Sequence, residues 1–174
     1  MENVQVLKIT RTKEIIFSAV FTMMAVWAPM LIHYFGGVDG GRKFLPMPFF
    51  VLLAGLLLGW RAGLVTALAS ASISFFLTGM PKVELLPFVT LQLAAYGFVA
   101  GLLKEKYNVF LSASVSIVSG WLAIGIALFL FSEMNVMNYV VWGIKIGIFG
   151  ILLQLILVPL IVVGVRHLRK RNEV

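Results

Sequence analysis

Lys145 is the residue of this sequence best suited to bind an anion, because it alone among the charged residues lies well inside a long apolar stretch. A cation there is costly unless it faces protein, water or an anion. Two interpretations follow. The ammonium group reaches the nearer membrane surface along its flexible side chain, or it binds an anion at the base of an outward-facing cavity. In the second case Trp142 and Tyr139, three and six residues earlier, would form walls beside it.

Two polar side chains, an amide and a phenol, share one helix face earlier in the sequence. Gln92 and Tyr96 are four residues apart, so their side chains lie one above the other on a helix. They are expected either to bond to a neighbouring helix or to contact a ligand. Trp121 is a weaker candidate, and with Tyr96 and Trp142 it would stack on a planar ring.

The remaining candidate binding residues lie between the apolar stretches. Segment 33–44 contains four glycines and is expected to be a mobile loop that closes over a ligand, with Arg42 and Lys43 at its end supplying positive charge. Glu84 is expected to open a helix, where the helix dipole favours an acid, or else to pair with a ligand or a lysine. Asn138 contacts the ligand in one interpretation and forms a turn in the other.

Catalytic and metal-binding patterns are missing from the sequence. It has no cysteine, and its two histidines, His33 and His167, are expected on opposite sides of a membrane. No motif of a hydrolase, a zinc protease or a phosphate-binding loop occurs. We therefore expect no enzyme activity, no cofactor and no metal ion, and the protein itself should not hydrolyse ATP.

The apolar stretches predict an all-α integral membrane protein that forms one domain over residues 1–174. Hydrophobic residues make up 61% of the chain and charged residues only 12%, which leaves no surface for a soluble domain. Spans of about 20 residues allow six transmembrane helices. We place these helices at 14–33, 45–60, 62–79, 84–103, 109–131 and 138–165.

Basic residues indicate how these helices are oriented. Ten of the 14 lysines and arginines fall in the odd-numbered gaps between the stretches and three in the even-numbered gaps. The positive-inside rule therefore predicts a multi-pass protein of the cell membrane with both termini in the cytoplasm. The net charge of +7 suits contact with anionic membrane lipid and gives no reason to expect nucleic acid.

Small and polar residues inside the stretches are expected to hold the helices together. Gln154 should form a hydrogen bond between helices, and glycines spaced four apart should allow close helix contacts. These glycines are Gly55, Gly59, Gly63, Gly97, Gly101, Gly143 and Gly147.

Three runs in the first four stretches resemble a known family. FLPMPFFVLLAGLLLG at 44–59, SFFLTGMP at 74–81 and LPFVTLQLAAYG at 86–97 are similar to the substrate-binding S components of energy-coupling factor (ECF) transporters. They look closest to the group that includes folate, pantothenate and riboflavin binders. The last two stretches match that family only in length and placement.

The resemblance implies a six-helix subunit in a prokaryotic cytoplasmic membrane that captures a vitamin from outside. The ligand would lie in the outer half of the bundle, under the loop between the first two helices and against helices four to six. A transmembrane T protein and two ABC-type ATPase subunits would supply the energy. Ser18 and Thr22, with Ala19 and Ala25 nearby, stand closest to the family's small-residue motif for contact with the T protein.

These expectations combine into one function, the binding subunit of an ECF-type importer of a vitamin or related micronutrient. Lys145, with Arg42 or Lys43, would favour an anionic vitamin such as pantothenate or a folate-like compound, because a partly desolvated cation attracts anions strongly. The alternative is a solitary small-molecule transporter or channel that works without ATPases.

Overall fold

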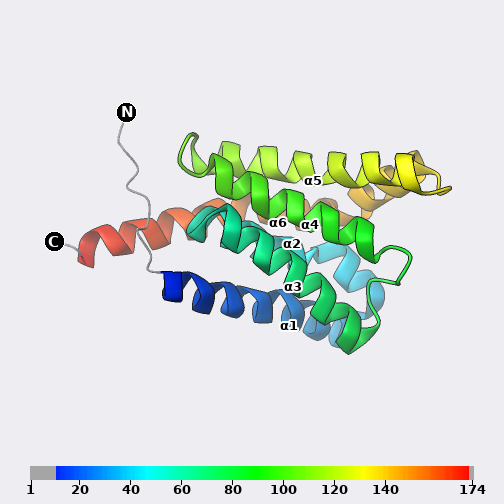
Figure 1. Cartoon of the computed structure of the whole chain (residues 1–174), viewed down its shortest axis with the longest axis horizontal. Helices are drawn as coiled ribbons and strands as arrows, with labels where there is room; N and C mark the ends of the chain where they lie inside the picture. The colour runs from blue at the N-terminus through cyan, green and yellow to red at the C-terminus, as the bar shows by residue number, and fades with distance from the viewer. Residues whose placement is uncertain (1–10, 173–174) are drawn as a thin grey trace.

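Six helices make up this computed structural model, which describes residues 11–172 but not the side chains of 33, 38, 39, 42 and 169–172. No strand occurs within that range. The helices are α1 (Arg11–Phe44), α2 (Pro46–Leu58), α3 (Trp60–Thr78), α4 (Leu86–Leu103), α5 (Val109–Phe131) and α6 (Val136–Asn172). Figure 1 shows them running back and forth along one axis.

Five of these helices are long and apolar enough to cross a membrane, so the expected helical multi-pass protein is confirmed in these terms. The exception is α2, whose 13 residues extend only about 20 Å at 1.5 Å per residue. The hydrocarbon core of a bilayer is about 30 Å thick. The fourth and fifth predicted helices agree best with the structure, while the first and sixth prove longer than expected.

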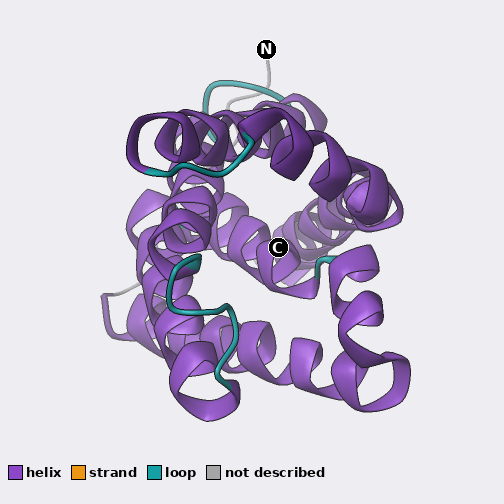
Figure 2. Ribbon diagram, turned by 90° about the vertical axis from the view of Figure 1, so that its right-hand side faces the viewer, coloured by secondary structure: helices purple, strands orange, loops and turns teal. Residues whose placement is uncertain are grey.

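The short helix α2 lies inside a ring formed by the other five. Around the ring the order is α1, α3, α4, α5 and α6, and α6 returns to α1, while α2 touches every member. Figure 2 shows the helices from the end that carries the α3–α4 and α5–α6 connections. In the described part of the chain, α4 and α6 do not touch each other directly. Both of them contact α2 and α5, which lie between them.

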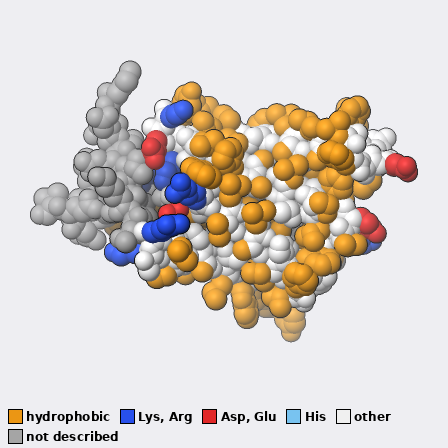
Figure 3. Space-filling model, in the orientation of Figure 1, with side chains coloured by type: hydrophobic (Ala, Val, Ile, Leu, Met, Phe, Trp, Pro, Cys, Tyr) orange, Lys and Arg blue, Asp and Glu red, His pale blue; other side chains and the backbone are white. Residues whose placement is uncertain are grey.

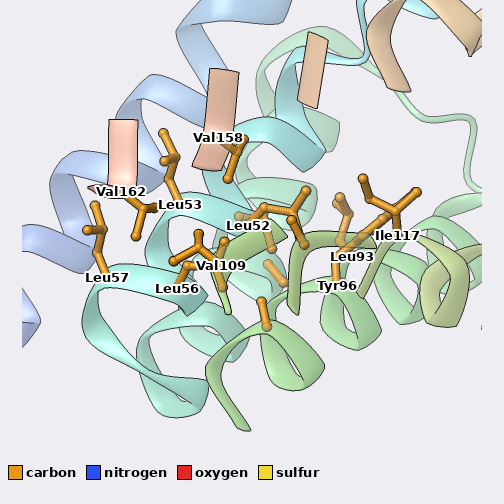
Figure 4. Close-up of a cluster of buried hydrophobic side chains, with 14 of the residues drawn as sticks. Leu52, Leu53, Leu56, Leu57, Leu93, Tyr96, Val109, Ile117, Val158 and Val162 are labelled. Carbon is orange, nitrogen blue, oxygen red and sulfur yellow. The ribbon is translucent and has the colours of Figure 1, made fainter. Parts of the chain in front are cut away.

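The main hydrophobic core surrounds α2. All seven residues from Val51 to Leu57 are buried, as expected for a helix that is apolar on every side. Leu52 and Leu56 pack with Tyr96 of α4 and Val158 of α6 in one cluster (Figure 4). The centre of the bundle is therefore filled around the part of α2 from Val51 to Leu57.

Glycines bring α4 close to α2 and α3, which confirms the expected role of several of them. Gly63 and Gly97 meet backbone to backbone, and a Cβ atom at Gly55 would lie 2.6 Å from the Gly97 carbonyl oxygen. Gly59 serves differently, because its φ of 121° joins α2 directly to α3 without a loop.

The glycine-rich segment 33–44 differs from the expected loop, because the backbone there is helical apart from a break at Gly37 (φ 63°, ψ −168°). The part of this segment that follows Gly37 ends against α6. A Cβ at Gly150 would lie 2.5 Å from the Phe44 carbonyl oxygen, and the Phe44 and Phe149 rings meet edge to face at 5.3 Å. Leu45 then adopts a left-handed conformation (φ 47°) before α2 begins. These contacts hold the segment in place.

Both described chain ends lie at the same end of the bundle (Figure 1), hereafter the basic end. Lys and Arg side chains gather there in Figure 3, and the middle of the face shown carries no charged side chain. Lys104 is only 6% exposed, and a Cβ at Gly59 would lie 3.3 Å from its ammonium nitrogen. Arg166 donates a hydrogen bond of 3.4 Å to the Leu56 carbonyl oxygen. Two cations thus face the C-terminus of α2, where the helix dipole favours positive charge.

Candidate functional site

Two rings packed on glycines join α4, α5 and α6 at one level near the middle of α4 and α5. The half of the bundle away from the basic end is hereafter the outer half, and Gln92 of α4 lies in it. The Tyr96 ring lies on Gly120, where a Cβ would approach it to 2.8 Å. The next residue, Trp121, packs on Gly143 of α6 with the same 2.8 Å spacing. Because Gly120 and Trp121 are consecutive, both contacts occur at nearly the same depth. We call Gln92, Tyr96, Trp121 and Gly143 the outer layer.

Tyr96 is buried and interacts with Gln92 of the outer layer instead of facing open space. Its side chain is 0% exposed and forms a hydrogen bond with the side chain of Gln92, which is only half-buried. A fully covered ring has no face left for stacking, so that expectation for Tyr96 is wrong. The pair instead holds the amide of Gln92 in place.

The indole nitrogen of Trp121 is buried and has no hydrogen-bond partner, although the side chain as a whole is only partly buried. An indole N–H is a donor and nothing else. Leaving such a donor unpaired costs about 1–3 kcal/mol. Trp121 is therefore the strongest indication in the outer layer that a further group belongs there, and nothing in the sequence marks its N–H as unpaired.

Lys145 does not belong to the outer layer. The inward face of α6 carries Gly143, Gly147, Gly150 and Gln154, and at about 100° per residue Lys145 lies about 200° from Gly143. Its side chain is exposed. Its nitrogen lies 6.0 Å from the centre of the Trp142 ring, which is itself 61% exposed. Of the two interpretations, this placement favours the lysine that reaches toward the membrane surface.

The angular relation between Lys145 and the glycines of α6 was available from the sequence. Gly143 and Gly147 were expected at a helix contact, and Lys145 lies on the opposite side of an ideal helix. Small residues at a contact therefore also tell which residues of that helix point away.

The remaining candidates lie near the start of α6 and the end of α1. Tyr139, one turn before Gly143, is partly buried, whereas Asn138 is exposed. The Asn135 side-chain oxygen accepts a 3.0 Å hydrogen bond from the backbone N–H of Asn138, so Asn135 caps the start of α6. Lys43 is exposed, and the side chain of Arg42 lies outside the described residues.

Glu84 lies on the rim of the bundle. It is exposed and precedes α4 by two residues, so it does not open that helix as expected. It borders an open depression of about 590 Å³. The depression is lined by Glu84, Phe131, Ser132, Glu133 and Met134.

Gln154 confirms the expected hydrogen bond between separate elements. Its side-chain nitrogen donates 3.1 Å to the Leu45 carbonyl oxygen at the junction of α1 and α2. The amide oxygen is buried without a partner. Gln154 therefore fixes the point where the chain turns into α2.

Ser18 and Thr22 face the interior and not a partner, contrary to expectation. They are 4% and 6% exposed, and the Thr66 hydroxyl of α3 lies 3.5 Å from the Ser18 carbonyl oxygen as donor. Ala25 is also buried, while Ala19 is exposed on the opposite face. The small-residue groove of α1 is filled by α3, since both carry short side chains there.

Comparison of the chain with protein-family models, with curated proteins and with solved structures gives no match. A function is therefore argued from the residues and their placement.

Proposed function

We propose that this protein is the substrate-binding S component of an ECF-type ABC transporter that imports a vitamin or related micronutrient. The observation that carries the proposal is the unpartnered N–H of Trp121 in the layer that also contains the half-buried Gln92. Trp121 lies ten residues before the end of α5 at Phe131, about 15 Å from the outer end at 1.5 Å per residue. That depth is about the middle of a hydrocarbon core of about 30 Å, which a small molecule taken from outside would have to reach.

The filled centre of the bundle favours a binding subunit over a solitary channel. Every side chain of α2 from Val51 to Leu57 is apolar or a glycine and buried, and Val158 and Val162 close the same region from α6. A conduit needs polar groups or water along its length. An arrangement with a polar outer layer above an apolar core binds a molecule and needs another protein to release it inward.

Separate subunits would provide that work. The sequence has no phosphate-binding loop, so the proposed partners are a membrane T protein and two ABC-type ATPases. Placing the basic end in the cytoplasm puts the outer layer on the outside and both chain ends inside, in accord with the positive-inside rule.

Affinity purification from native membranes tests the proposal. ATPase subunits are expected to be captured with the protein. Liposomes that contain the whole assembly should take up substrate only when ATP is present on the side of the membrane that carries the ATPase subunits. Uptake by the purified chain alone, driven by an ion gradient, would establish the solitary transporter in its place.

A further inference from the structure

We infer that the molecule bound in the outer layer is electrically neutral and accepts a hydrogen bond from the indole N–H of Trp121. This inference rests on the proposed function and names the chemical class of its substrate. It departs from the anionic vitamin that Lys145 favoured in the sequence.

The fold gathers uncharged polar groups in the outer layer and places charged ones elsewhere. The layer offers the amide of Gln92 and the indole of Trp121. Lys145 points away from the bundle, Lys43 is exposed, and Glu84 lies on the rim. Among the side chains that the structure describes, the one buried charged residue is Lys104, which lies at the basic end beside Gly59.

The N-terminus of α2 does not replace the missing positive charge. This end of α2 points toward the outer half (Figure 1), and a helix N-terminus normally attracts anions through its free N–H groups. Pro46 and Pro48 occupy two of the first three helical positions, and proline has no N–H. Two of the four free N–H groups at the start of α2 are thus missing, which weakens this end as a site for a carboxylate or phosphate.

Desolvation then selects against an anion. An ionised group moved from water into this layer would lose its hydration without gaining several donors or a cation from the side chains that the structure describes, which is strongly unfavourable. A carbonyl oxygen or ring nitrogen needs a single donor, and the Trp121 N–H supplies one. The half-buried amide of Gln92 offers one further donor and one acceptor, so a neutral heterocycle or amide can be satisfied.

Matched pairs of probes test the charge preference. The purified chain in phosphatidylcholine nanodiscs is titrated calorimetrically with riboflavin and its 5′-phosphate, nicotinamide and nicotinate, and pyridoxine and its 5′-phosphate. We expect a neutral member to bind at least about tenfold more tightly than its anionic counterpart, a difference that corresponds to about 1.4 kcal/mol. Tighter binding of an anionic member overturns the inference on charge but leaves the proposed function standing. Binding of none of the six also overturns the inference, whereas the proposed function is contradicted separately, if no ATPase subunit is captured with the protein.

Trp121→Phe tests the hydrogen bond, because it keeps an aromatic ring and removes the N–H together with the five-membered ring that carries it. Affinity for the neutral probe should fall about five- to tenfold, the effect of one hydrogen bond. The matched control is Trp27→Phe, which makes the same change on the exposed face of α1. Equal affinities for the two variants would show that the Trp121 N–H does not contact the probe. Thermal unfolding of both variants checks that each remains folded.

Discussion

At the residue scale, the structure favours Trp121 as the main candidate for ligand binding, whereas the sequence favoured Lys145. A lone lysine in an apolar stretch is conspicuous in a sequence, whereas an indole in a membrane helix is ordinary. The side of α6 on which Lys145 lies depends on how α6 meets α5, and the pairing of the Trp121 N–H depends on what surrounds it in space. The first could be predicted from the glycine spacing, and the second could not.

Lys145→Ala distinguishes the two placements directly. An ammonium group that faces away from the outer layer should change the affinity of the best-binding neutral probe by less than about twofold, whereas a direct ionic contact would be worth at least about tenfold. Calorimetric titration of the variant beside Trp121→Phe measures both effects on one scale. A tenfold loss for Lys145→Ala would return Lys145 to the binding site.

Lys104 predicts a pH dependence of stability. Burial lowers the pKa of Lys104 below its usual value of 10.5, with nearby Glu105 opposing this effect. The charged form is therefore disfavoured in the folded state, and this destabilisation is fully present below the folded pKa. As the pH rises through the folded pKa toward 10.5, the folded protein loses the proton first and stability increases.

Denaturant unfolding between pH 7.5 and 10 measures this effect against Lys104→Met. The free energy of unfolding of the wild type should rise with pH relative to that variant. Lys106→Met, a change at an exposed lysine two residues away, should not produce the same pH-dependent difference. Parallel curves for the wild type and Lys104→Met would show that Lys104 is well solvated.

At the element scale, helix limits were predictable where local chemistry sets them. Helix α5 begins after Asn108, whose side chain accepts a 2.7 Å hydrogen bond from the Leu111 N–H, and its predicted range 109–131 agrees with the structure. The segment 33–44 was not predictable in this way. Its glycines allow a loop, but packing of Phe44 on Gly150 and Phe149 holds it as helix, and such distant contacts leave no local signal.

The contact between α3 and α4 should be sensitive to a single methyl group. Gly63→Ala places a Cβ against the backbone of Gly97, and neither helix can yield without separating from the other. We expect a loss of about 1–3 kcal/mol, typical of overpacking. Gly164→Ala is the matched control, because nothing lies within 4 Å of a Cβ there. Thermal unfolding in detergent compares the two, and equal midpoints would contradict the close contact.

At the scale of the whole molecule, the ring around α2 could not be anticipated from hydropathy. A run such as 45–60 has the composition of a full span, and only its position among five neighbours shows that it is a short central helix. The gathering of cations at one end did follow from the sequence (Figure 3), because charge is read residue by residue. Sequence thus predicted the number of helices and the charged end but not which helix lies in the middle.

The absence of cysteine makes the orientation directly testable. Met134→Cys lies in the α5–α6 connection and Tyr107→Cys in the α4–α5 connection, and both positions are exposed. A membrane-impermeant thiol reagent added to intact cells should label the cysteine at 134 and leave the one at 107 unlabelled until the cells are permeabilised. The reverse pattern would invert the topology and place the outer layer in the cytoplasm.

The hydrogen bond from Gln154 to Leu45 also bears on how the protein is made. A ribosome delivers α1 and α2 long before α6, so the turn between them enters the bilayer without the amide and without Gly150 that later hold it. The ring is open until α6 arrives between α5 and α1. Biosynthesis therefore passes through a stage in which five helices are inserted but the ring is still open between α5 and α1. Chains halted before residue 154 should be recognised by membrane quality control as incomplete.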